Sequence, residues 1–77
     1  NEAFAVIDVL FARSFAQSLD KYNVFGGALA YGHPYGASGG IITLHLLEAL
    51  KRCSGRYGAA SVAAAGGVGT ALLLERV

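Results

Sequence analysis

The chain has little charge and a single cysteine. Only 14% of its 77 residues are charged and the net charge is +1, so it lacks the strongly basic face that nucleic-acid binding requires. Cys53 has no second cysteine to pair with, which excludes an internal disulfide. Because the chain also opens without a basic stretch followed by an apolar core, no signal peptide is expected. These features are compatible with a reducing compartment, and we expect a cytoplasmic location.

Long apolar runs are also missing. The most apolar stretch, Ile41 to Leu50, is interrupted by His45 and Glu48 and falls far short of the roughly 20 residues that cross a bilayer. No membrane partner is therefore expected. Yet 55% of the residues are hydrophobic, and a fold of this size buries only about 60% of its unfolded surface. We expect a large apolar patch that meets a partner surface.

Apolar spacing and glycine positions predict five elements in the order helix, strand, helix, strand, strand. Their expected ranges are Ala3–Leu19, Gly26–Tyr31, Ser38–Cys53, Gly58–Ala64 and Thr70–Val77. The glycines between the last two strands permit a tight reversal. This order predicts an α/β fold with helices packed on a mixed sheet, in which the second helix forms a right-handed crossover between the first two strands.

One histidine lies in a glycine-rich turn directly before the second helix, in the segment Gly-His-Pro-Tyr-Gly-Ala-Ser-Gly-Gly. Gly32 and Gly36 allow backbone geometries closed to other residues, and Pro34 fixes one torsion. Ser38 offers an oxygen that can cap the helix. The pattern predicts a rigid His33 near a helix N-terminus, which is how a catalytic imidazole is held. Without further motifs, a histidine that only caps a helix or bonds a carbonyl fits equally well.

Two further motifs stand in order with the histidine segment. The chain opens with Asn-Glu-Ala-Phe-Ala, and Ala-Ala-Ala-Gly-Gly-Val-Gly spans residues 63–69. Together the three motifs resemble the C-terminal end of thiolases, over nearly the whole chain. The resemblance implies a thiolase-like α/β fold in which residues 1–77 form a partial C-terminal domain, without its opening strand and without the N-terminal half. The motif at residue 1 and the lack of an initiator methionine lead us to expect a piece of a longer polypeptide.

The same resemblance implies roles for individual residues. His33 would activate a nucleophilic cysteine of the other half and help bind a thioester oxygen, and Asn1 would hold a water that completes this oxyanion hole. The backbone N–H of Ala65 would serve a second oxyanion hole, provided that its conformation does not demand positive φ. Ala63 stands where the family has a second cysteine that exchanges the substrate's α proton, so this proton-transfer position is degenerate.

These roles predict the C-terminal part of an acyl-CoA acyltransferase of lipid metabolism, incomplete on its own, for Claisen condensation or thiolysis of 3-oxoacyl-CoA. A coenzyme A thioester is then the substrate, and no metal or organic cofactor is implied; residues that bind a cofactor are not identified. The expected partners are the missing N-terminal half and a second copy of the protein. Two alternatives stay open: an inactive thiolase-like subunit or fragment acting in assembly or acyl-CoA binding, and a decarboxylating condensing enzyme that needs no second cysteine.

The remaining candidates favour structural roles. His45 lies in mid-helix without a second ligand at metal-binding spacing, so a packed histidine is expected. Cys53 follows two basic residues at a helix end and is expected to be a structural thiol. The late glycines match neither a phosphate loop nor a dinucleotide motif. The carboxylates, including Glu2, show no paired spacing and are expected to be surface charges.

Overall fold

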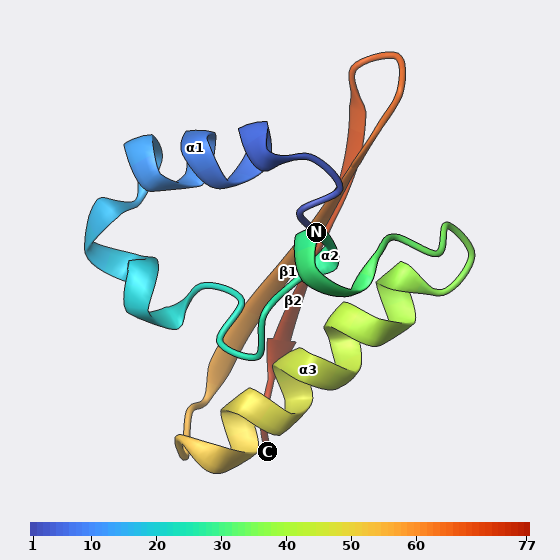
Figure 1. Cartoon of the computed structure of the whole chain (residues 1–77). Coiled ribbons are helices and arrows are strands. Elements are labelled where there is room, and N and C mark those ends of the chain that lie inside the picture. The colour runs from blue at the N-terminus through green and yellow to red at the C-terminus, as the bar shows by residue number, and fades with distance from the viewer.

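The computed structural model describes all of residues 1–77, with four helical segments followed by two strands. They are α1 (Ala5–Ser14), the 3-10 helix η1 (Ala16–Lys21), α2 (Ala28–Tyr31), α3 (Ser38–Arg52), β1 (Tyr57–Ala64) and β2 (Val68–Glu75). Figure 1 shows a long hairpin of β1 and β2 with α3 running beside it, while α1 and η1 form an arm that stands away from α3. No helix is both long and apolar enough to cross a bilayer.

The first helix is shorter than predicted. It ends at Ser14, and Phe15 leaves the helical region with φ −137° and ψ 46° before η1 begins. The turn brings Tyr22 back onto Phe11, and the two rings stack with their centroids 4.1 Å apart. The single helix expected over residues 3–19 is therefore two segments, because aromatic packing between them replaces a continuous backbone ladder.

The strand predicted at Gly26–Tyr31 is wrong. Residues Ala28–Tyr31 form the single turn α2, in which the amides of Ala30 and Tyr31 donate to the carbonyl of Gly27. A short apolar run does not distinguish a strand from a buried helical turn, and here no neighbouring strand is present to pair with it. Without this strand there is neither a crossover nor a mixed sheet, and the sheet is a two-stranded antiparallel one.

The hairpin itself was predicted correctly, with small shifts at its ends. Its register runs from Tyr57 opposite Glu75 to Ala64 opposite Val68. Gly66 and Gly67, in the turn, have φ of 85° and 76°, a region that favours glycine. The glycines therefore allow the tight reversal that the sequence indicates.

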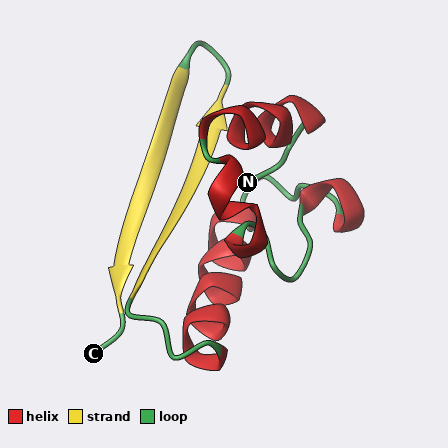
Figure 2. Cartoon of the chain, turned by 90° about the vertical axis from the view of Figure 1, so that its left-hand side faces the viewer, coloured by secondary structure: helices red, strands yellow, loops and turns green.

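All helices lie on one side of the hairpin (Figure 2). Gly58 faces α3 so closely that a Cβ there would meet the side chains of Leu46 and Leu50. Because strand residues alternate between faces, the half-buried Ala60 and Val62 share this side with Gly58. The opposite face of the hairpin is bare.

The buried core is very small, and many large apolar side chains are exposed, as predicted. Five of the 77 residues are buried. They are Glu2, Gly27, Ala28, Ser38 and Leu50. Large apolar side chains are exposed instead, for example Leu73 on the bare face of the hairpin, at 73%. Two of the five buried residues are polar, and both belong to motifs that the sequence marks as functional.

Candidate functional site

His33 is held in a turn that joins α2 to α3. Gly32 ends α2 with φ 97°, and its amide donates to the carbonyl of Ala28 at 2.8 Å. The carbonyl of Pro34 then accepts the amides of Ala37 and Ser38, both at 2.9 Å. The predicted place of the turn, beside a helix N-terminus, is thus confirmed, with Gly32 as the residue that requires glycine geometry.

Two details of the prediction are wrong. Gly36 is not among the residues with positive φ, so its backbone is open to other residue types. Ser38 does not cap α3, whose N-cap is Ala37 without a side-chain hydrogen bond. Its Oγ instead lies 2.5 Å from Nδ1 of His33, and Ser38 is only 3% exposed. The turn brings the serine hydroxyl back to the imidazole, so the oxygen serves the ring and not the helix end.

Asn1 joins the histidine turn to the hairpin. Its side-chain Nδ2 lies 3.3 Å from Nδ1 of His33. Its backbone nitrogen donates to the carbonyl of Ser61, in β1, at 2.6 Å. The structure thus brings together two of the predicted site residues, Asn1 and His33, which are 32 positions apart.

The second ring nitrogen of His33 faces a different environment. Nε2 forms no hydrogen bond within the chain, whereas Nδ1 has two neighbours. The ring is half-buried, and Tyr35 contacts it edge-on with centroids 4.9 Å apart. Nε2 is therefore the ring atom available to a bound molecule.

Glu2 is a structural residue of the site that the sequence did not reveal. It was expected at the surface, but it is buried and its carboxylate accepts hydrogen bonds from Nδ2 of Asn23 at 2.8 Å and from the amide of Leu29 at 3.3 Å. It thereby ties the residue beside Asn1 to the start of α2. The only sequence signal was the pair Gly26-Gly27, since Gly27 leaves the space that the carboxylate fills.

Ala63 and Ala65 lie two and four residues beyond Ser61, whose carbonyl accepts from Asn1. Ala63 is exposed in β1, opposite Gly69, and alternation places it on the face turned away from α3. Ala65 begins the hairpin turn, which projects beyond the helices in Figures 1 and 2. The φ of Ala65 is not positive, so alanine adopts this backbone conformation without strain, as the expected role of its amide requires. No hydrogen bond joins either alanine to His33, and the strand covers about 7 Å from Ser61 to Ala63.

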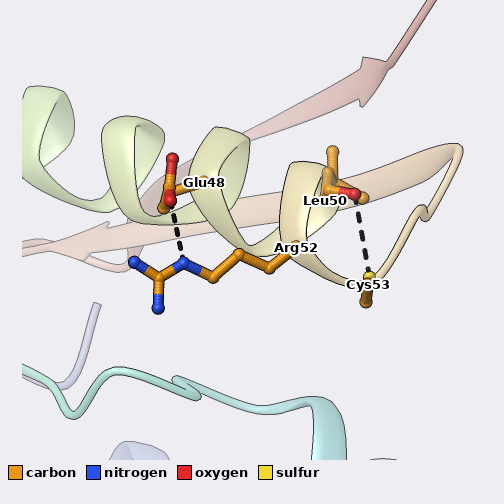
Figure 3. Close-up of polar contacts among 4 residues, drawn as sticks. All are labelled: Glu48, Leu50, Arg52 and Cys53. Atoms are coloured by element: carbon orange, nitrogen blue, oxygen red, sulfur yellow. Dashed lines mark hydrogen bonds and ion pairs between the residues drawn. The ribbon is translucent and has the colours of Figure 1, made fainter.

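Cys53 lies at the other end of α3 from the histidine turn. At 1.5 Å per residue, it is about 22 Å along the helix from Ser38. Its exposed thiol points back to the carbonyl of Leu50, 3.9 Å away (Figure 3). In the preceding turn Nε of Arg52 donates to Glu48 at 2.8 Å, which lowers the pKa of the Glu48 carboxyl. Cys53 is therefore far from the imidazole of His33 within this chain.

His45 is a packed histidine, as predicted. Its ring meets Phe25 and Tyr31 edge-on, with centroids 5.7 and 5.8 Å away. No group of three or more His, Cys, Asp or Glu side chains is arranged to hold a metal ion.

The fold and site define a small α/β unit built around an imidazole, a primary amide and a buried hydroxyl. The sequence profile described as "Thiolase, C-terminal domain" matches residues 1–76. The chain belongs to the thiolase family, in its C-terminal domain.

Similar proteins carry names of the same family. The chain is 49% identical over 77 residues to an acetyl-CoA acetyltransferase of Synechocystis sp., and 44% identical over 77 residues to acetyl-CoA acetyltransferase IB of Candida tropicalis. It is 44% identical over 75 residues to the mitochondrial 3-ketoacyl-CoA thiolase of Homo sapiens. These matches cover 97 to 100% of this chain but only 19% of each relative. No solved structure matches it significantly.

Proposed function

We propose that this chain supplies the histidine side of a thioester site in a thiolase-like acyl-CoA acyltransferase. The observation that carries the proposal is the contact of Asn1 and Ser38 with Nδ1 of His33, which leaves Nε2 free. The chain spans about a fifth of the length of its curated relatives, so the nucleophilic cysteine is proposed to come from the part outside residues 1–77.

The proposed reaction is thiolysis of a 3-oxoacyl-CoA or the reverse Claisen condensation. In thiolysis the bond between the α and β carbons breaks, the β carbonyl becomes a new thioester, and the α carbon takes up a proton. Charge develops on the thioester oxygen as this bond breaks, so a preplaced donor lowers the barrier. The imidazole Nε2 of His33 is proposed to meet that oxygen, together with a water held by Asn1. The amide of Ala65 is proposed as the donor of a second oxyanion hole.

The residue at position 63 favours a second candidate function. Alanine has no group that takes or gives a proton, so the α-carbon exchange has no base at this position. A subunit that keeps His33 and lacks this base is suited to acyl-CoA binding or to assembly without turnover. Both candidates require the N-terminal half and a second copy as partners, and neither requires a metal or organic cofactor.

The proposed location is the cytoplasm. Relatives bear both kinds of name: the rat and mouse acetyl-CoA acetyltransferases are called cytosolic, and the human 3-ketoacyl-CoA thiolase is called mitochondrial. Cell fractionation followed by detection of the histidine segment decides between the two compartments.

The decisive experiment is an assay of the full-length protein, including the N-terminal half, with acetoacetyl-CoA and free coenzyme A. We expect consumption of the 3-oxoacyl thioester, and we expect His33→Gln to lower kcat by at least about 100-fold, the usual effect of removing one oxyanion donor. His45→Gln is the matched control, because His45 packs against aromatic rings and lies outside the cluster. Equal activity of the His33 variant and the wild type would refute the role of His33. Binding of acetyl-CoA without turnover would favour the second candidate.

A further inference from the structure

We propose that Ser38 is a positioning residue that, with Asn1, holds the neutral His33 ring in the tautomer protonated at Nε2. What the ring binds rests on the proposed function, whereas the tautomer is a property of this chain alone. The sequence pointed to Ser38 only as a helix cap.

The position of Ser38 is set by the backbone on both sides. Its amide donates to the carbonyl of Pro34 at 2.9 Å, and it is the first residue of α3. Its Oγ is bonded only to His33, and no buried side-chain oxygen or nitrogen in the chain lacks a partner. Since a hydroxyl in a site that is 3% exposed has no access to bulk water, its hydrogen bond to the imidazole is obligatory.

The second neighbour of Nδ1 determines the direction of this hydrogen bond. The amide nitrogen of Asn1, 3.3 Å from Nδ1, is a donor only. A proton on Nδ1 would point at the amide hydrogens, whereas a lone pair there accepts from them. The Ser38 hydroxyl has no acceptor other than Nδ1, so donating to this lone pair satisfies its proton, whereas accepting from Nδ1–H would leave that buried proton without a partner. Both contacts favour an unprotonated Nδ1, which places the proton of the neutral ring on Nε2.

This tautomer places the ring proton on the free nitrogen, Nε2. Nε2–H has no partner within the chain and belongs to a half-buried ring, so it presents a preplaced donor to a bound molecule. In the resting chain His33 is then prepared to hold a carbonyl or enolate oxygen, and not to accept a proton at that atom. A turn of the Ser38 hydroxyl, which can also accept, allows the other tautomer when a thiol proton must be taken.

The test measures the tautomer directly. The full chain is labelled with ¹⁵N at the histidine rings, and long-range proton–nitrogen correlation spectra are recorded with the ring neutral. His33→Gln and His45→Gln assign the signals of these two rings. We expect an unprotonated Nδ1 and a protonated Nε2 in His33 of the wild type. Ser38→Ala should shift the tautomer ratio toward Nδ1–H by about tenfold, the effect of losing one ordinary hydrogen bond.

Matched variants separate positioning from folding. Ser38→Thr keeps the hydroxyl and should keep the wild-type ratio, and Thr43→Val removes a hydroxyl of the same helix that bonds the carbonyl of Gly39, so it should have no effect. Asn1→Asp replaces the donor by an acceptor and should move the proton to Nδ1. If Ser38→Ala does not fold, Ser38→Cys, with a weaker donor of similar size, replaces it in the comparison.

A wild-type ring protonated at Nδ1, or an unchanged ratio in the Ser38 variants, overturns the proposal. The expected tautomer combined with no consumption of acetoacetyl-CoA would leave the positioning intact and overturn the proposed reaction. Turnover of acetoacetyl-CoA by a protein in which His33 has the other tautomer would overturn the positioning role and leave the proposed reaction intact.

Discussion

The carboxyl group of Glu2 fills the space beside Gly27 that any larger residue would need. A Cβ built on Gly27 would overlap the Glu2 side chain. The same carboxylate accepts hydrogen bonds from Asn23 and from the amide of Leu29, so it joins the first residues of the chain to the start of α2. Asn1 precedes Glu2 and contacts His33, so this buried carboxylate lies next to the candidate site.

Replacing Gly27 by alanine should destabilise the fold. The new methyl group must displace the Glu2 carboxylate from its hydrogen bonds, and overpacking of this kind costs about 1 to 3 kcal/mol. Urea unfolding of the full chain measures the change. Gly36→Ala is the control, since its Cβ would meet nothing within 4 Å and its φ is not positive; its free energy of unfolding should change by less than about 0.5 kcal/mol. Equal effects of both variants would show that the Glu2 contact does not exclude a side chain.

Removing Glu2 should be costly and should couple to position 27. Glu2→Ala leaves the Asn23 amide and the Leu29 N–H without their acceptor, at about 1 to 3 kcal/mol. In the double variant with Gly27→Ala the overlap no longer exists, so the two costs should not add. A coupling energy of about 0.5 kcal/mol or more in a double-mutant cycle is expected. Strict additivity would mean that the two residues act independently.

Tyr22 should make the stability of the chain sensitive to alkaline pH. Burial, and then its 2.6 Å hydrogen bond to the Asp8 carboxylate, raise the pKa of Tyr22 above the ordinary value near 10. A group whose pKa is raised in the folded state stabilises that state fully below the unfolded pKa, and the contribution is lost as pH rises through the folded pKa. Unfolding free energy should therefore fall above about pH 10.

Tyr22→Phe tests this origin of the alkaline loss. The variant keeps the ring that stacks on Phe11 and removes the titrating hydroxyl, so its stability should fall less steeply above about pH 10. Ultraviolet titration of the tyrosinates should show one late-titrating group in the wild type that is missing from the variant. Identical pH profiles would assign the alkaline loss to other groups.

Local signals predicted the hairpin and the histidine turn, because both are specified within a few residues. Gly66 and Gly67 supply the φ values of the reversal, and Gly32 and Pro34 shape the turn that holds His33. The helix predicted over Ser38–Cys53 spans Ser38–Arg52, so the prediction differs from the structure by one residue at the C-terminal end.

Contacts between distant residues account for what the sequence did not reveal. Whether Ser38 caps its helix or bonds His33 depends on the path of the turn, and both uses satisfy the same hydroxyl. Glu2 is buried only because Gly27 and Asn23, more than 20 positions away, surround it. The apolar run before Gly32 fits a strand in length and composition, yet no second strand lies beside it.

Position 63 decides between the two candidate functions, and its surroundings make the test possible. Ala63 is exposed on β1, so a thiol can be added there without disturbing the packing against α3. If the missing base is the only defect, Ala63→Cys in the full-length protein should raise thiolysis of acetoacetyl-CoA from background by about 100-fold or more, and deuterium exchange at the α carbon of acetyl-CoA should appear with it.

The matched control for this variant is Ala59→Cys. Position 59 is also exposed and lies on the same face of the same strand, so it adds a thiol of similar reactivity at a site that the family does not use. A gain at position 63 alone identifies a thiolase that has lost its proton-transfer group. Consumption of a malonyl thioester by the wild type, with no gain from either cysteine, identifies a decarboxylating enzyme. If neither reaction occurs while acetyl-CoA still binds, we conclude that His33 binds the thioester without catalysing its cleavage. Binding of the thioester oxygen needs no base, whereas cleavage of the carbon–carbon bond requires both the oxygen-binding donor and the base.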